Sequence, residues 1–172
     1  MQTKINTIVL TLLLWSIVIS GCGYYSFSGS TLPPHLRTIA IPIFENRTTE
    51  FGIPEDLTDA LIDKFTEDNS LKVLDRRAAD SMIAGTILSV REQAGAYTVQ
   101  EQVKEIRIYI RIQAKFEDIK KNKVMWEQEF TQWGTYNPDL PLTQSGSNRQ
   151  DAIEEALEKI SADIFNKTIG GW

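Results

Sequence analysis

Residues 103–116, VKEIRIYIRIQAKF, decide how this chain folds. From position 105 onward, charged or polar side chains alternate with apolar ones at every second position. Successive side chains of a strand point to opposite faces of its sheet, so this pattern predicts a long strand with one buried and one open face. The predicted buried face consists of Ile106, Ile108, Ile110, Ile112, Ala114 and Phe116, and the open face of Glu105, Arg107, Tyr109, Arg111, Gln113 and Lys115.

The neighbouring segments predict further strands of the same sheet. Residues 120–123 form a turn into a return strand, 124–133, in which Val124, Trp126 and Phe130 are expected on the buried face. Runs rich in β-branched residues predict three other strands, at residues 37–44, 71–74 and 81–90. Pro42 cannot donate a ladder hydrogen bond, so we expect it at a sheet edge or near a bulge. Gly95 is expected in the loop that follows residues 81–90.

Two segments have the periodicity of amphipathic helices. In residues 54–69, Leu57, Leu61 and Phe65 share one face, and Pro54 suits the first turn. A second helix is expected to end near residue 169, and Ser147 and Gln150 before it have the spacing of a capping box. The sequence therefore predicts an α+β fold: a two-layer sandwich in which two amphipathic helices pack on one face of a mostly antiparallel or mixed sheet of four to five strands.

The first residues have the three parts of a secretory signal: the positive Lys4, an apolar run at 8–19 and small residues after it. That run is about 12 residues long, whereas a membrane-spanning helix needs roughly 20. Ile19-Ser20-Gly21-Cys22 resembles the lipobox of bacterial lipoproteins, whose cysteine is acylated and becomes the first residue of the mature chain. We therefore predict a signal peptide at 1–21, a lipidated tether at 22–36 and a single α+β domain at 37–172.

The charges and the residue inventory exclude several functions. The formal net charge is −5, and loss of the signal peptide with its one charged residue, Lys4, makes it −6, which argues against nucleic-acid binding. Cys22 is the only cysteine and His35 the only histidine, so zinc ligands are lacking. We expect no enzyme activity, no cofactor and no metal, and we expect His35 to be structural or solvated.

Three basic residues of the long strand form a candidate binding site. Arg107, Arg111 and Lys115 recur every four residues on the open face, roughly 13 Å apart. One interpretation is a solvated face whose charge is balanced by Glu127 and Glu129 on the return strand. The other is a track for the phosphates of a membrane glycolipid, since arginine pairs well with phosphate.

Three motifs, taken in order, resemble the LptE family of lipopolysaccharide-assembly lipoproteins. They are the lipobox followed by Gly23-Tyr24-Tyr25, the strand ending Ile41-Pro42-Ile43-Phe44-Glu45-Asn46-Arg47-Thr48, and the helix beginning Pro54-Glu55-Asp56-Leu57. The resemblance implies a lipid-anchored protein on the periplasmic side of the outer membrane. Such a protein sits as a plug inside a large β-barrel of the LptD type, helps the barrel to assemble and can bind lipopolysaccharide. We expect its barrel contacts in loops at 45–52, 94–102 and 134–146.

The second motif also resembles lipoproteins that regulate periplasmic peptidoglycan synthases, which gives an alternative function. Those proteins usually have a long disordered linker, whereas residues 23–35 extend at most roughly 45 Å. The short tether keeps the domain close to the membrane and favours the plug. A hydrolase that uses His35 is a third and weaker alternative.

The lipobox gives the first testable prediction. We expect Cys22→Ser to abolish acylation and to leave the signal peptide uncut or poorly cut, because the thiol is the predicted acceptor of the lipid. Metabolic labelling with a radioactive fatty acid, with the wild-type chain as the control, measures this. Label retained by the variant would contradict the lipoprotein assignment.

Overall fold

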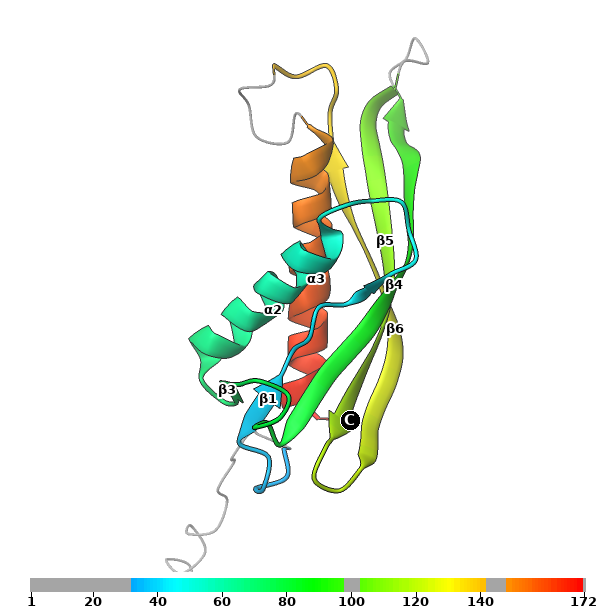
Figure 1. Ribbon diagram of the computed structural model, residues 1–172. Helices are drawn as coiled ribbons and strands as arrows, with labels where there is room; N and C mark the ends of the chain where they lie inside the picture. Colours follow the sequence, from blue (N-terminus) through cyan, green and yellow to red (C-terminus); the bar gives the residue numbers. More distant parts are fainter. Residues whose placement is uncertain (1–31, 98–102, 142–147, 172) are drawn as a thin grey trace, which may run out of the picture.

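Three long strands make up most of the sheet. The computed structural model describes residues 32–97, 103–141 and 148–171. Within them β4 pairs antiparallel with β5, and β5 with β6 (Figure 1). Three short strands lie on the other side of β4, where β1 pairs parallel with β3 and β4, and β2 pairs parallel with β4. The strands are β1 (Thr38–Ala40), β2 (Glu45–Asn46), β3 (Lys72–Val73), β4 (Ser81–Tyr97), β5 (Val103–Asp118) and β6 (Lys123–Tyr136).

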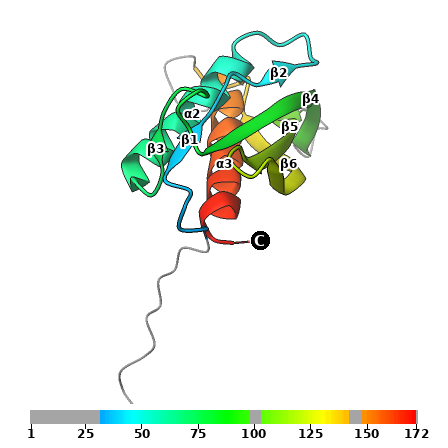
Figure 2. The same cartoon turned by 60° about the horizontal axis from the view of Figure 1, so that its bottom comes forward.

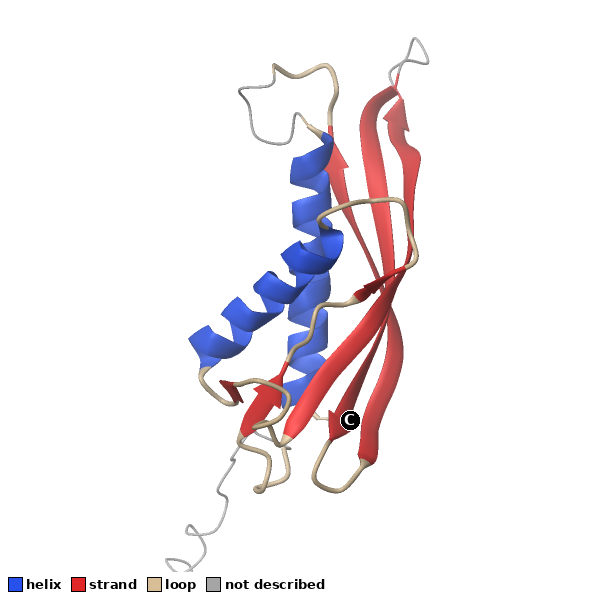
Figure 3. Ribbon diagram, viewed as in Figure 1, coloured by secondary structure: helices blue, strands red, loops and turns tan. Residues whose placement is uncertain are grey.

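Both helices lie on one face of this sheet (Figure 3). Helix α2 (Ile53–Asp68) packs on α3 (Arg149–Ile169), and α3 packs on β5 and β6. Pro54 stands in the first turn of α2, and Asn69 ends that helix in the left-handed conformation with its N–H bonded to the Phe65 carbonyl. The predicted α+β class and its two layers are confirmed, and the sheet is mixed, in the order β3-β1-β4-β5-β6 with β2 beside β4.

The alternation along β5 divides the molecule into a core and an open face as predicted. Ile108, Ile110 and Ile112 are fully buried under the helices, as are Ala114 and Phe116. Their partners on the neighbouring strands include Ile87, opposite Ile112, and Trp126, opposite Phe116. The face that bears the charged residues of β5 is on the other side of the sheet from both helices.

Helix α3 lies close to the backbone of β6 at Gly134. This glycine is opposite Ile108 on the inner face, and a Cβ built on it would lie 1.9 Å from the carbonyl oxygen of Ala152 in α3. A backbone carbonyl cannot swing aside as a side chain does, so any larger residue at position 134 would push the helix off the sheet. Ala152 and Ala156, both fully buried, keep the helix side of this contact small.

Three strand boundaries differ from the prediction. The strand predicted at 37–44 breaks after Ala40, and Pro42 lies in the break, between β1 and β2, where its missing donor does no harm. The loop predicted at Gly95 is wrong, because β4 continues to Tyr97. Residues on β5 supply ladder partners along the whole extension: Ile106 opposite Ala94, Glu105 opposite Ala96 and Val103 opposite Tyr97. In the same way, Gly134 and Tyr136 belong to β6 and not to a loop.

Two residue placements were also wrong. Val124 was predicted on the buried face but is 48% exposed. The pairing shifts between Phe116, opposite Trp126, and Glu117, opposite Val124, so Met125 is an extra residue that turns Val124 to the open face. The cap of α3 is Asn148, whose side-chain oxygen accepts the Asp151 N–H at 2.9 Å. Ser147, the predicted cap, lies outside the described residues.

Candidate functional site

The predicted basic stripe, Arg107, Arg111 and Lys115, lies on the open face of β5, and each of its cations has a carboxylate neighbour. Arg107 Nε is 3.0 Å from Glu105, Arg111 is 3.7 Å from Glu129 and Lys115 Nζ is 2.6 Å from Glu117. The hydrogen bond to Glu105 raises the pKa of Arg107. These pairs are partly exposed, and exposed pairs hold each other weakly. The stripe is therefore balanced in charge, and a phosphate would have to displace glutamates.

The free edge of β6 is covered by polar side chains of α3. Glu155 accepts the Thr135 N–H at 2.9 Å, Lys159 donates to the Trp133 carbonyl at 2.9 Å, and Asp163 accepts from the Gln132 side chain at 2.6 Å. Unpaired strand edges invite association with other chains, and these contacts prevent it along this part of β6. The sequence analysis did not predict that α3 covers the edge of β6. A usable signal was the spacing of four residues between the polar positions 155, 159 and 163, which places them on one side of the helix beside its apolar face.

The loop between β2 and α2 is held in place by hydrogen bonds from Arg149 and from Asn46. Arg149, the first residue of α3, donates two hydrogen bonds to Glu50, of 2.9 and 2.7 Å, and a third to Glu92 on β4. Hydrogen bonds to these two carboxylates raise the pKa of Arg149. Within the loop, the Asn46 side chain accepts the Thr48 N–H at 2.9 Å and donates to the Glu50 carbonyl at 2.6 Å.

Two large apolar side chains are exposed on either side of β2, one of them on this fixed loop. Phe51 is 98% exposed and Ile43, before β2, is 64% exposed. A large apolar side chain that is almost fully exposed on an ordered loop is a candidate anchor for a partner. The loop is also one of the three segments in which we expected barrel contacts.

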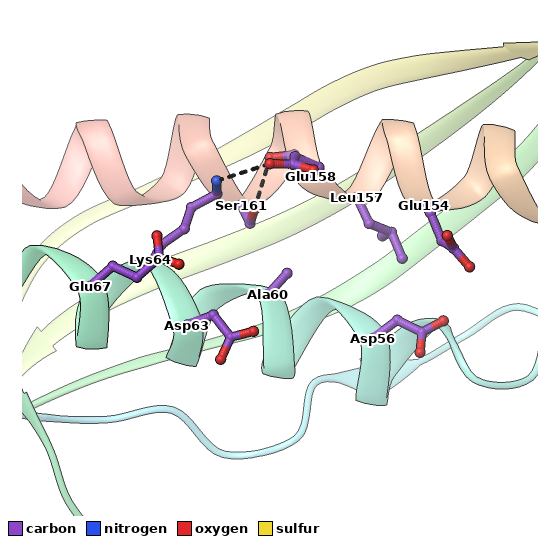
Figure 4. A pocket seen from close by; sticks show the side chains of 9 residues that line it. All are labelled: Asp56, Ala60, Asp63, Lys64, Glu67, Glu154, Leu157, Glu158 and Ser161. Atoms are coloured by element: carbon purple, nitrogen blue, oxygen red, sulfur yellow. Dashed lines mark hydrogen bonds and ion pairs between the residues drawn. The ribbon is translucent and has the colours of Figure 1, made fainter. Parts of the chain in front are cut away.

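A groove between the two helices is lined mainly by acidic side chains (Figure 4). Its volume is about 310 Å³, and carboxylates surround an apolar floor of Ala60 and Leu157. Burial, followed by the nearby charge of Glu154, raises the pKa of Asp56 at one end. The single cation of the groove, Lys64, is 3.5 Å from Glu158. This excess of negative charge disfavours any ligand that carries phosphate. The lining carboxylates are Asp56, Asp63, Glu67, Glu154 and Glu158.

Two carboxylates hold the beginning of the described chain against the sheet. Asp118, 1% exposed, lies 2.6 Å from the His35 ring and accepts the Lys121 N–H at 2.9 Å. Burial acts to raise the pKa of Asp118, but these hydrogen bonds outweigh it and lower the pKa. His35 therefore has a structural contact, one of the two roles that the sequence analysis expected for it.

The second carboxylate, Asp80, accepts the N–H groups of Arg37 at 2.9 Å and Thr38 at 3.1 Å, and lies 2.5 Å from Lys120. Its hydrogen bond with Lys120, followed by the one from Arg37, lowers its pKa well below the usual range. With Asp118, it fastens residues 35–38 to the start of β4 and to the end of β5.

Within residues 32–97, 103–141 and 148–171, no group of three or more His, Cys, Asp or Glu side chains is arranged to hold a metal ion. No helix in those ranges is both long and apolar enough to cross a membrane. Cys22, the predicted lipidation site, precedes the first described residue.

A model of the LptE family, described as lipopolysaccharide-assembly, matches residues 36–168. The chain belongs to the LptE family. The match begins just before β1 and ends one residue before the end of α3, so it covers the sheet and both helices of this LptE-family chain. The resemblance inferred from the sequence motifs is confirmed. A search of curated protein sequences gave no match.

Solved structures share the fold of this LptE-family chain at low sequence identity. Protein XCC0632 of Xanthomonas campestris is 12% identical, covers 81% of this chain and 90% of its own, and has a TM-score of 0.58. The hypothetical protein CT253 of Chlamydia trachomatis is 9% identical, with coverages of 79% and 99% and a TM-score of 0.55. A minor lipoprotein of Acinetobacter baumannii is 12% identical, with coverages of 77% and 91% and a TM-score of 0.51. At these identities the likeness shows the fold alone.

The hydrogen bonds of Asp80 predict a pH-dependent stability. Its folded-state pKa lies below the roughly 3.9 of an unfolded aspartate, so its charge stabilises the fold above about pH 4, and this contribution falls as the pH drops towards the lowered pKa. We expect Asp80→Asn to lower the free energy of unfolding at neutral pH by on the order of 1–3 kcal/mol. Urea unfolding should show the difference from wild type narrowing steadily below about pH 4.

The control for this prediction is Asp75→Asn, which neutralises an exposed carboxylate shortly before β4. It should change the free energy of unfolding by less than about 0.5 kcal/mol. An Asp80→Asn difference of the same size at every pH would contradict the proposed linkage.

Proposed function

We propose that this LptE-family chain is an outer-membrane lipoprotein, anchored through Cys22 on the periplasmic side. In this proposal it plugs, and helps to assemble, a β-barrel of the LptD type that inserts lipopolysaccharide into the outer leaflet. The family match over residues 36–168 is the observation that carries the proposal. The lipobox at residues 19–22 supports the anchor, and the short segment between Cys22 and His35 supports a position close to the membrane.

The fixed loop before α2 is the surface that we assign to the barrel. A plug must present side chains to a surrounding wall without losing its own fold. Phe51 meets this requirement because its ring is almost fully exposed, while the preceding residue, Glu50, is held by Arg149 at its carboxylate and by Asn46 at its carbonyl. Apolar anchors of this kind provide much of the binding energy of protein interfaces.

The barrel contact can be tested by crosslinking in the native membrane. A photo-crosslinking residue at Thr49, Phe51 or Tyr136 should capture an outer-membrane barrel protein, and one at Asp63, in the acidic groove, should capture less. Phe51→Ala should reduce copurification of the barrel several-fold, and Phe51→Leu should retain most of it because an apolar anchor remains. The free energy of unfolding should change by less than about 0.5 kcal/mol in both variants, since the ring is exposed.

Capture of only a peptidoglycan synthase from these positions would contradict the barrel assignment. It would favour the alternative regulatory function in its place.

We further propose the basic stripe as a contact for the phosphates of lipopolysaccharide. Its three cations lie in a row on the open face, and exposed glutamates are weak competitors for a ligand that carries several phosphates. The row also lies on the other side of the sheet from the acidic groove, which would repel the same ligand.

Direct binding of purified lipopolysaccharide tests this contact. Arg107→Ala combined with Arg111→Ala should weaken binding by about tenfold or more, because charge-assisted bonds to phosphate are lost. Lys64→Ala combined with Lys167→Ala removes the same charge from the helices and should leave the affinity within about twofold, because neither residue lies on the stripe. Equal affinity of the stripe variant and the wild type would show that the stripe is only a solvated face.

A further inference from the structure

One end of the domain carries six cations that form no ion pair with any described residue. All six are exposed, and they come from three segments that are distant in the sequence. Figure 2 turns this end toward the viewer. We call these residues the basic end: Arg37, just before β1; Lys72 in β3; Arg76 and Arg77, in the turn after β3; and Lys121 and Lys123, around the turn between β5 and β6.

Hydrogen bonds and a shared cavity connect these segments. The Lys72 N–H donates to the Arg37 carbonyl at 3.0 Å. Arg76 and Lys123 line the same small cavity, of about 130 Å³, together with Asn122. The Lys121 N–H donates to Asp118, whose other oxygen contacts His35. The cations therefore surround the point at which residues 35–37 join the sheet.

The carboxylates nearby do not neutralise this charge. Asp80 is engaged by Lys120, Asp118 by His35 and Glu117 by Lys115. Glu67 and Asp68, at the end of α2, and Asp75, beside Arg76 in the sequence, remain exposed, and the six unpaired cations outnumber these three carboxylates. The whole chain has the opposite sign, with a formal net charge of −5. Positive charge is thus concentrated at this end, while the groove between the helices is acidic.

The basic end lies at the side of the domain from which the chain leads to the predicted lipid anchor. The tether enters the domain here, and the segment between Cys22 and His35 spans at most roughly 45 Å when extended. Val124, an apolar side chain turned outward by the bulge in β6, lies beside Arg76 and Lys123 in the lining of the shared cavity. Cations mixed with an exposed apolar side chain are typical of surfaces that lie on anionic bilayers.

We propose that the basic end binds the phosphate groups of anionic phospholipids in the leaflet that holds the Cys22 anchor, and so orients the domain on the membrane. The proposal rests on the lipid anchor of the proposed function. The loop that carries Phe51, residues 47–52, begins where β2 pairs with β4 at Ile87. This point is about 20 Å along the strand from the basic end, so the loop would face away from the lipid surface. The anchor would then fix the distance of the domain from the membrane, and the basic end its orientation.

The test uses the full lipoprotein reconstituted in nanodiscs. Cys22 is the only cysteine and is acylated in the proposed mature chain, so Ala78→Cys gives a single thiol for a fluorophore in the turn that holds Arg76 and Arg77. Discs of phosphatidylethanolamine, with or without a third of phosphatidylglycerol, carry a headgroup-linked quencher. We expect strong quenching only with phosphatidylglycerol, and its loss at about 1 M salt, where the Debye length is only about 3 Å. A label at Thr49→Cys should be quenched weakly in all discs.

Two matched variants locate the charge that matters. Arg76→Gln with Arg77→Gln and Lys123→Gln should reduce the quenching several-fold. Lys64→Gln with Arg91→Gln and Lys167→Gln removes equal charge from other parts of the surface and should leave the quenching unchanged. Equal loss in both variants, or quenching that is independent of phosphatidylglycerol and of salt, would overturn the proposal. The salt series on the wild-type protein decides the question even if a variant folds poorly.

Two further outcomes separate this proposal from others. Quenching that appears only when lipid A replaces phosphatidylglycerol would overturn it and assign the basic end to lipopolysaccharide. The acyl anchor is tested separately, by whether the protein stays bound to discs of phosphatidylethanolamine alone. Dissociation from these discs would contradict the proposed lipid anchor. Quenching that depends on phosphatidylglycerol would still support the basic end as the lipid contact.

Discussion

The contact between the backbones of α3 and β6 at Gly134 is the constraint on which the rest of the structure depends. With no side chain on the strand, the helix comes within van der Waals distance of the sheet and covers the apolar row of β5. The same approach brings Glu155 and Lys159 to the edge of β6, where they satisfy the backbone groups of Thr135 and Trp133. One close contact thereby buries the core and closes an exposed edge.

Packing both helices on one face leaves the opposite face of the sheet open, and it separates the surface charges into regions. Carboxylates gather in the groove between the helices, paired charges cover the open face of β5, and unpaired cations gather where the tether enters. A lipid-anchored protein that contacts both a membrane and a partner needs different surfaces for each. In our proposals, the basic end contacts the membrane and the loop that carries Phe51 contacts the barrel, at separate positions along β4.

Two errors of the sequence analysis, at Gly95 and at Val124, share one physical cause. Gly95 was assigned to a loop from its residue type, but a strand continues as long as its neighbour offers ladder partners, and β5 does so as far as Val103. Val124 was placed on the buried face from its period, but one extra residue in β6 reverses that face. Strand ends and register are set by pairing between segments, and neither pairing partner nor bulge can be read from one segment alone.

The sequence by itself determined the elements that arise from local periodicity: the long alternating strand, the two amphipathic helices and the α+β class that follows from them. It also contained the motifs that indicated the LptE family. Only the tertiary structure decided which distant side chains meet. Glu50 and Arg149, 99 positions apart, fix the loop of Phe51, and His35 meets Asp118 from 83 positions away. Such contacts depend on the strand register and on the height at which α3 crosses the sheet, and these are properties of the whole fold, not of any one segment.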